Sequence, residues 1–352
     1  MKRKIELIKS YLKKDKINSC ILSSQQGRYW LSNFQSSFGF IVITKKEVTY
    51  FLDGRYYQKG LKEIDTTKIN VKLYETRETL ADYFYSNSIT SAFLEEEYTT
   101  LAELSFFQDL LDDIKPIKGK ELRIIKNKNE IDNLRNAANK ICEVMEWIKK
   151  EIKPGMTEKE VANLISCRII ETGGECNSFD PIVASGPNGA YPHHSPTDRL
   201  IRDGEFITID MGCKYKGYCS DLTRTFAIGK PNCIELIKAY DVVLKSNKTG
   251  IKKAKSGITG QKLDKYCRDI ISATEFKDYF VHSTGHGVGI DVHELPNVSQ
   301  NYKDTFPANS IVTIEPGIYI PNVGGIRIED MILITDDGCE VLTESITKKR
   351  EW

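Results

Sequence analysis

Four carboxylates in the second half of the chain stand inside segments that are otherwise apolar or that alternate between apolar and polar residues. They are Asp210, Asp221, Glu315 and Glu329. An ionised carboxylate is costly to bury in such a segment unless it is paired or binds a metal ion. A solvated hairpin or an edge strand would explain any one of them. Their recurrence in several segments instead favours a shared cation site.

The two aspartates lie on either side of a predicted hairpin. Alternation over residues 206–211 places Asp210 on one face of a strand and the aliphatic side chains on the other. A turn centred on residues 215–216, with Gly217 at positive φ, would place Asp210 directly opposite Asp221. Cβ atoms opposed in this way lie about 4.5–5.5 Å apart, so two like charges destabilise the sheet unless a cation lies between them.

Three of the five histidines fall within residues 281–294, VHSTGHGVGIDVHE. His286 is flanked by glycines, which allow the backbone and a ligand to approach it closely. His282 and His293 lie near the two ends of the same segment. A single histidine is more often a satisfied core residue than a ligand, but three in one glycine-rich segment favour a metal or catalytic site.

Together these residues form an oxygen-rich ligand set with one imidazole: Asp210, Asp221, His286, Glu315 and Glu329. Its carboxylates carry four negative charges, which two divalent cations would neutralise. Such a set suits Mn²⁺, Zn²⁺, Co²⁺ or Fe²⁺ better than a metal that prefers thiolates. Two ions about 3.5–4 Å apart can activate water and polarise a carbonyl group. The predicted chemistry is therefore metal-assisted hydrolysis.

The first part of the chain contains alternating helical and strand patterns but no comparable cluster of polar residues. The patterns predict strands over residues 19–22, 38–43, 48–52, 69–73 and 92–94, and helices over residues 56–64, 77–85 and 99–111. This order indicates an α/β domain with a mixed or parallel sheet. The charged segment 112–128, which contains Pro116 and Gly119, marks a boundary. We therefore expect two domains, residues 1–120 and residues 121–352.

The second domain must position the ligand set. Its helical patterns cover residues 128–152, 234–255 and 261–274, and strands and turns fill most of the rest. Thr157 and Glu160 form a capping box that opens one further helix. A long polar loop, residues 186–194, precedes the predicted hairpin and contains His193 and His194.

Composition excludes several classes of function. The chain has 352 residues, a formal charge of +1 and 40% hydrophobic residues. This balance gives no electrostatic reason to expect nucleic acid or an anionic membrane as a partner. No segment has the apolar length of a signal peptide or a membrane span. Nine cysteines without CxxC spacing are typical of reduced thiols in the cytoplasm, where we expect the protein.

The chain resembles the pita-bread metallopeptidases in the order Asp, Asp, His, Glu, Glu and in the motifs IDMG, SDLTRTF, STGHGVG, TIEPG and GGIRIED. More narrowly, it resembles their Xaa-Pro peptidase branch, which includes aminopeptidase P and prolidase. RYWLSNF at residues 28–34 and FLDGRY at residues 51–56 are similar to the creatinase-like N-terminal domain of that branch. The resemblance implies an α/β creatinase-like N-terminal domain with a mixed sheet, followed by an α+β pita-bread catalytic domain.

The resemblance also implies how the metal ligands are divided. Asp210 would chelate one metal ion, and Asp221 and Glu329 would bridge both ions. His286 and Glu315 would bind the second ion. Glu315 would in addition act as the acid and base that handles the proton of the attacking water.

Further roles follow from the same resemblance. His193 and His293 match the outer histidines that steady the scissile carbonyl and the tetrahedral intermediate by hydrogen bonding. His282 and Arg327 match residues that hold the ligand carboxylates and the S1′ wall. His194 has no counterpart with a role, and we expect it to be a surface or loop residue.

We expect a homodimeric, dimetal Xaa-Pro aminopeptidase that acts on short proline-containing peptides, with Mn²⁺ the favoured metal. The alternative is an Xaa-Pro dipeptidase, in which a basic residue commonly follows the His-Glu-x-Pro element; here Asn297 follows it. A catalytically inactive pita-bread binding protein and a metal-free creatine-type hydrolase are disfavoured because all five ligands are present. A methionine aminopeptidase would not normally carry the first domain.

Overall fold

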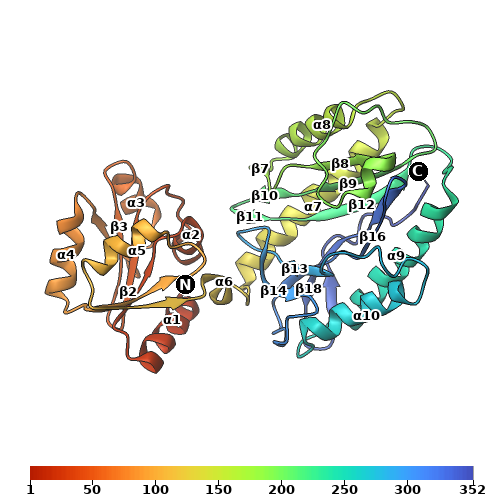
Figure 1. The fold of residues 1–352 in the computed structure, drawn as a ribbon. Helices are drawn as coiled ribbons and strands as arrows, with labels where there is room; N and C mark the ends of the chain where they lie inside the picture. Colours follow the sequence, from red (N-terminus) through yellow and green to blue (C-terminus); the bar gives the residue numbers. More distant parts are fainter. Residues whose placement is uncertain (352) are drawn as a thin grey trace. The chain divides into compact units, whose positions relative to one another are not determined.

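The structure is a computed structural model and describes residues 1–351. The chain divides into two units, of which the first is Met1–Arg123 and the second begins at Ile124. Each unit has its own sheets and its own buried core (Figure 1). Within residues 1–351, none of the helices combines the length and the apolar character needed to cross a membrane.

The first unit is built on one six-stranded sheet in the order β4-β3-β2-β1-β5-β6. Its strands are β1 (Ser19–Leu22), β2 (Phe40–Thr44), β3 (Val48–Leu52), β4 (Asn70–Leu73), β5 (Ser91–Glu95) and β6 (Asp113–Ile117). β2 is antiparallel to both of its neighbours, whereas the other pairs are parallel. The predicted α/β class with a mixed sheet is therefore confirmed.

Helices α1 to α6 connect and flank these strands. They are α1 (Lys2–Asp15), α2 (Gln25–Ser32), α3 (Tyr57–Glu63), α4 (Arg77–Ser86), α5 (Leu101–Gln108) and α6 (Gly119–Leu122). The sequence patterns did not indicate α2 or β6. β6 does not show a strand pattern in the sequence because it is charged, largely exposed and contains Pro116. Such a strand is tolerated at the edge of a sheet, where one of its sides has no partner strand.

Four long helices frame the second unit. They are α7 (Lys128–Glu151), α8 (Glu158–Glu171), α9 (Ile234–Lys253) and α10 (Gly260–Ser272). The predicted capping box opens α8: Thr157 Oγ1 accepts from the Glu160 backbone N–H at 3.1 Å, and Glu160 Oε2 accepts from the Thr157 N–H at 2.7 Å. This fixes the position at which α8 begins and places Glu158 in its first turn.

The strands of the second unit form several small sheets. β8 (Ile182–Ser185), β9 (Phe206–Met211) and β12 (Leu222–Ala227) make an antiparallel sheet in the order β12-β9-β8. A five-stranded sheet has the order β14-β13-β15-β18-β19, and β16 and β17 form a separate two-stranded hairpin. The bounds of these strands are β13 (Gly285–Gly287), β14 (Glu294–Val298), β15 (Ile311–Ile314), β16 (Gly317–Ile320), β17 (Gly324–Arg327), β18 (Asp330–Ile334) and β19 (Cys339–Val341). β7 (Cys176–Asn177), β10 (Cys213–Tyr215) and β11 (Tyr218–Cys219) form the remaining sheet.

Three buried cores cover these strands, and one of them joins α10 to β14, β15 and β18. Apolar residues of α7 and α8 pack with Ile207, Ile209 and Met211 of β9, which confirms the predicted apolar face of that strand. α9 lies beside α10 and packs its apolar residues against β16 and β17 (Figure 1). Every residue of β9 and of β12 is buried, so a solvated surface hairpin is excluded.

The register of the hairpin differs from the prediction by two residues. The strands pair Asp210 with Thr223 rather than with Asp221. The turn is centred on Lys216 and Gly217, which both have positive φ, at 44° and 70°. Such a two-residue turn matches the twist of the flanking strands. Asp221 therefore keeps the predicted face but lies diagonal to Asp210 rather than opposite it.

Candidate metal centre

A cavity of about 530 Å³ in the second unit collects all of the residues that the sequence nominated. Its lining includes His193, Asp210, Asp221, His282, His286, His293, Glu315, Arg327 and Glu329. The other lining residues come mainly from β8 and the loops around it. Residues that lie more than 130 positions apart in the sequence thus meet at one site.

Each of the five candidate ligands lies in or next to a strand, which gives it a fixed position. Asp210 is in β9, Asp221 directly precedes β12, and His286 is in the middle of β13. Glu315 directly follows β15 and Glu329 directly precedes β18. Backbone hydrogen bonds tie these positions to other strands, since the Glu315 N–H donates to the Thr284 carbonyl at 2.7 Å and the Glu329 N–H to the Thr223 carbonyl at 3.1 Å.

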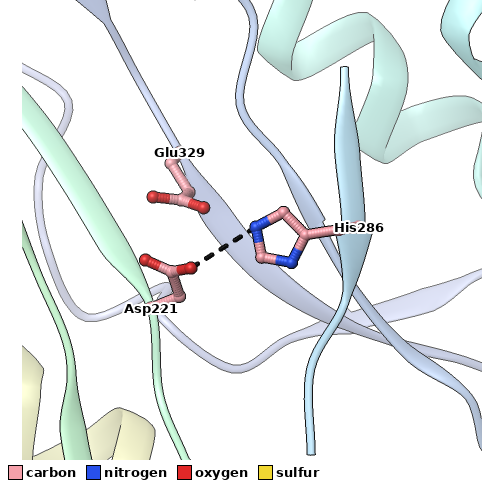
Figure 2. A group of neighbouring side chains, drawn as sticks. All are labelled: Asp221, His286 and Glu329. Atoms are coloured by element: carbon pink, nitrogen blue, oxygen red, sulfur yellow. Dashed lines mark ion pairs between the residues drawn. The ribbon is translucent and has the colours of Figure 1, made fainter. Parts of the chain in front are cut away.

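Three of the five offer ligand atoms that lie close enough together to hold one ion. One atom each from Asp221, His286 and Glu329 lie within 4.8 Å of one another, and Figure 2 shows the three side chains directed toward a common point. His286 Nε2 lies 3.5 Å from Asp221 Oδ2 and 3.4 Å from Glu315 Oε1. Asp210 and Glu315 line the same cavity but lie outside this group of three.

The His286 ring presents a lone pair to the carboxylates. Its Nδ1 lies 3.0 Å from the Gly287 carbonyl, an acceptor, so Nδ1 carries the proton. Burial, with the neighbouring His293, lowers the pKa of His286 to about 3, so the ring is neutral and Nε2 is unprotonated at pH 7. An unprotonated nitrogen facing two carboxylates is a favourable arrangement only when a cation accepts electron pairs from all of them.

The carboxylates show the same need for positive charge. Burial raises the pKa of Asp221 and of Glu329, and the nearby carboxylates raise both further. Burial also raises the pKa of Glu315 to about 7, with a further increase from Asp210 and an opposing effect from Arg327. Asp210 Oδ1 is buried and has no hydrogen-bond partner among residues 1–351. An unpaired buried oxygen beside these crowded acids fits a divalent cation.

A chain of hydrogen bonds supports the centre from one side. Arg327 Nη2 donates to Asp210 Oδ2 at 2.6 Å, and Nη1 donates to the Tyr319 hydroxyl at 2.8 Å. The Tyr319 hydroxyl lies 2.8 Å from His282 Nε2, and His282 Nδ1 lies 2.7 Å from the Ser283 carbonyl. Since burial lowers the pKa of His282 to about 4, its Nε2 accepts from Tyr319. Arg327 thus holds Asp210 in place, and Tyr319 holds His282 in the adjoining wall of the cavity.

Sequence reasoning missed Tyr319, the residue that joins these two. Tyr319 alternates with Ile318 and Ile320 in β16, and those two pack in the apolar core. A single tyrosine between two isoleucines is common in strands, so the alternation showed that Tyr319 faces away from the core but not what it contacts. Its partners come from other segments of the chain, and only the fold brings them together.

The outer histidines differ in their surroundings. The His293 ring lies edge-on to the His286 ring, with centroids 4.3 Å apart and an interplanar angle of 73°. His193 lines the cavity from an exposed loop. His194 was expected to be a surface or loop residue; it lies in a loop, but its side chain is only 10% exposed and its Nε2 lies 2.8 Å from Glu158 Oε2.

Comparison with known proteins agrees with this geometry. Residues 132–336 match the family described as metallopeptidase family M24, and residues 4–135 match the creatinase/prolidase N-terminal domain. The first match covers more than half of the chain. The chain belongs to metallopeptidase family M24.

Other M24 proteins match along nearly the whole chain. The putative Xaa-Pro aminopeptidase of Mycoplasma genitalium is 44% identical over 349 residues, which are 99% of this chain and 98% of the relative. The Xaa-Pro dipeptidase of Pyrococcus horikoshii is 34% identical over 350 residues, 98% of either chain. The solved structure of the Xaa-Pro dipeptidase from Bacillus anthracis has a TM-score of 0.95 at 34% identity and covers 99% of both chains. That of the X-Pro aminopeptidase from Thermotoga maritima has a TM-score of 0.87 at 31% identity and covers 95% of this chain and 97% of the other.

Membership in M24 confirms the pita-bread architecture of the second unit and the creatinase-like architecture of the first. It makes the protein a hydrolase of the metallopeptidase class and implies divalent metal ions, for which Asp221, His286 and Glu329 form a candidate site. The relatives with printed activities include both aminopeptidases and dipeptidases that act on Xaa-Pro peptides.

Proposed function

We propose that this protein is a dimetal Xaa-Pro aminopeptidase, which removes the N-terminal residue from short peptides whose second residue is proline. The observation that carries the proposal is the cavity itself. It joins a carboxylate-imidazole centre, suited to divalent cations, to histidines that lie outside the ligand set. The Xaa-Pro activities printed for the relatives support the proline specificity.

In this proposal five residues hold two ions: Asp210, Asp221, His286, Glu315 and Glu329. Divalent ions at such a site supply Lewis acidity, which polarises a carbonyl group and makes water more acidic. Glu315 would accept and return the proton of the attacking water, since its carboxylate lines the cavity beside the other candidate ligands. The oxygen-rich donor set favours Mn²⁺ as the physiological metal.

The outer histidines would act on the substrate rather than on the metal. His193 and His293 line the cavity beside the ligand set, where an imidazole N–H can donate to the carbonyl oxygen as negative charge develops on it. Arg327 would serve indirectly, because its hydrogen bond fixes Asp210 and its contact with Tyr319 fixes His282.

The choice of aminopeptidase over dipeptidase rests on the charges that line the cavity. A dipeptidase must bind the free carboxylate of its Xaa-Pro substrate, for which a guanidinium is well suited. Among the described residues that line the cavity, Arg327 is the only lysine or arginine, and each of its three side-chain nitrogens already donates to the protein. Asn297 lines the cavity but brings no charge.

The remaining features of the proposal are a homodimer and a cytoplasmic location. The homodimer rests on the resemblance to the Xaa-Pro peptidase branch. The location is supported by the nine cysteines, all of which are free thiols, as is typical of a reducing compartment.

The test compares two substrates of the metal-reconstituted protein, an Xaa-Pro-Xaa tripeptide and the matching Xaa-Pro dipeptide. We expect kcat/KM to be at least about tenfold higher for the tripeptide, because the dipeptide carboxylate finds no free cation. Asn297→Arg should reduce this preference, and Asn297→Ala is the control without charge. A dipeptide preference of tenfold or more would make the protein a dipeptidase, and Asn297→Arg should then change little.

A further inference from the structure

Glu158, in the first turn of α8, is a fully buried carboxylate that gathers the loop following β8. Its Oε1 accepts from the backbone N–H and the hydroxyl of Ser185, both at 2.8 Å, and from Asn188 Nδ2 at 3.0 Å. Its Oε2 accepts from the backbone N–H of Thr197 at 3.0 Å and from the Thr197 hydroxyl at 2.7 Å. His194 Nε2 lies 2.8 Å from the same oxygen. One side chain thus binds both ends of the segment 185–197.

The charge of Glu158 determines whether His194 donates or accepts the hydrogen bond between them. Burial alone would raise the pKa of Glu158, but the hydrogen bonds from His194, Ser185, Thr197 and Asn188 together lower it to about 2. The carboxylate is therefore ionised and can only accept hydrogen bonds. His194 Nε2 must carry a proton to donate to it. The position of Glu158 at the N-terminus of α8 further favours the negative charge.

His193 lies between two fixed neighbours. On one side, the Pro192 carbonyl accepts from Arg327 Nη1 at 3.2 Å. On the other, His194 is held by Glu158, and its ring stacks on that of Tyr191 at a centroid distance of 6.4 Å. The His193 side chain lines the cavity from this exposed loop. Its position is therefore set by the backbone on either side.

We infer that Glu158 and His194 form an anchor that positions His193 against the substrate, with His194 as a positioning residue of the active site. The inference rests on the proposed function, in which His193 donates to the scissile carbonyl. Without the contact between His194 and Glu158, the residue that follows His193 would lose its side-chain anchor, and the His193 ring would lose its fixed distance from the reacting atoms. A displacement of about 1 Å from the productive geometry can reduce a rate by about 100-fold.

Three variants test the anchor. His194→Ala removes the hydrogen bond to Glu158, and His194→Gln restores a donor at a similar reach. Lys159→Ala is the matched control, because it removes the exposed ion pair between Lys159 and Asp198 on the same loop, where Nζ and Oδ2 are 2.9 Å apart.

The first measurement is hydrogen exchange of the metal-reconstituted protein, which does not depend on activity. In His194→Ala we expect exchange at the amides of Tyr191 and Thr197 to become about tenfold faster, because the loop opens locally more often. His194→Gln should restore most of the protection, and Lys159→Ala should match the wild type. Wild-type exchange in His194→Ala would overturn the anchor, whatever the protein hydrolyses.

The second measurement is a double-mutant cycle on an Xaa-Pro-Xaa tripeptide. His194→Ala should lower kcat/KM by about 10–100-fold with unchanged metal content. In a His193→Ala background the same change should cost less than about twofold, because the residue that it positions is already gone. An equal loss in both backgrounds, or no loss in either, would overturn the positioning role. If the wild type cleaves no Xaa-Pro peptide, the proposed function fails, and hydrogen exchange alone decides the anchor.

Discussion

Removal of the metal should make the contribution of the buried site carboxylates to stability fall as the pH rises. The carboxylates of the candidate centre have pKa values raised by burial and by one another, so the metal-free folded state holds protons that the unfolded chain releases. A carboxyl group whose pKa is higher in the folded state stabilises that state only while it is protonated. This contribution is fully present below the unfolded pKa, and it is lost as the pH rises through the folded pKa.

The size of the effect can be worked from Glu315. Its pKa is raised from 4.5 to about 7, and at about 1.36 kcal/mol per pKa unit this corresponds to about 3 kcal/mol of unfolding free energy. Most of the loss should occur between about pH 5 and pH 8. Asp221 and Glu329 shift in the same direction and add to the loss, whereas the lowered pKa values of His282 and His286 offset part of it up to about pH 6.5. A divalent ion reverses the sign, because it binds the deprotonated carboxylates and stabilises the folded state most at high pH.

The assay is urea unfolding of chelator-treated protein at pH 5, 6.5 and 8, with and without saturating Mn²⁺. We expect the unfolding free energy of the metal-free wild type, relative to that of metal-free Glu315→Gln, to fall by about 3 kcal/mol over this range, and to change much less when metal is bound. Glu315→Gln is the reference because its side chain cannot titrate, and Glu340→Gln on the exposed surface should keep the wild-type pH dependence. A metal-free wild type and Glu315→Gln variant with the same pH dependence from pH 5 to pH 8 would refute the reasoning.

Five substitutions separate ligands from supporting residues. Glu329→Ala should bind fewer than the about two metal ions per chain that we expect for the wild type. His286→Ala should also bind less metal, because it removes a ligand. Atomic absorption on the reconstituted proteins measures the metal content of both variants. His193→Ala and His293→Ala should lower kcat by about 10²–10³ with unchanged metal content, and loss of metal in His293→Ala would identify it as a ligand instead. Tyr319→Phe should lower kcat/KM by about tenfold without loss of metal, because it removes the hydroxyl between His282 and Arg327.

The residues of the candidate centre can be nominated from the sequence because their signal is local. A carboxylate between apolar neighbours is visible in a strand pattern, and Glu315 and Glu329 stood out in that way before the fold was known. The strand face on which Asp210 lies could also be predicted, because side chains alternate between the two faces along any strand. The resemblance then supplied the family, which the comparisons confirm.

The register of the hairpin was not predicted, because it depends on which two residues occupy the turn. Lys216 takes a positive φ beside Gly217, and a lysine gives little indication of that conformation. The contact between His194 and Glu158 joins positions 36 residues apart, and nothing local to either residue indicates it. Such contacts are properties of the packed loop, as is the hydrogen bond from Tyr319 to His282.

The most direct test of the central claim is a metal titration of the chelated protein in which bound metal and hydrolysis of an Xaa-Pro-Xaa tripeptide are measured on the same samples. We predict that cleavage of the bond preceding proline is absent without metal, rises with added Mn²⁺ and saturates near two bound ions per chain. Cleavage that persists in the chelated protein, or bound metal that brings no cleavage of the tripeptide or of the corresponding dipeptide, would contradict a dimetal Xaa-Pro peptidase.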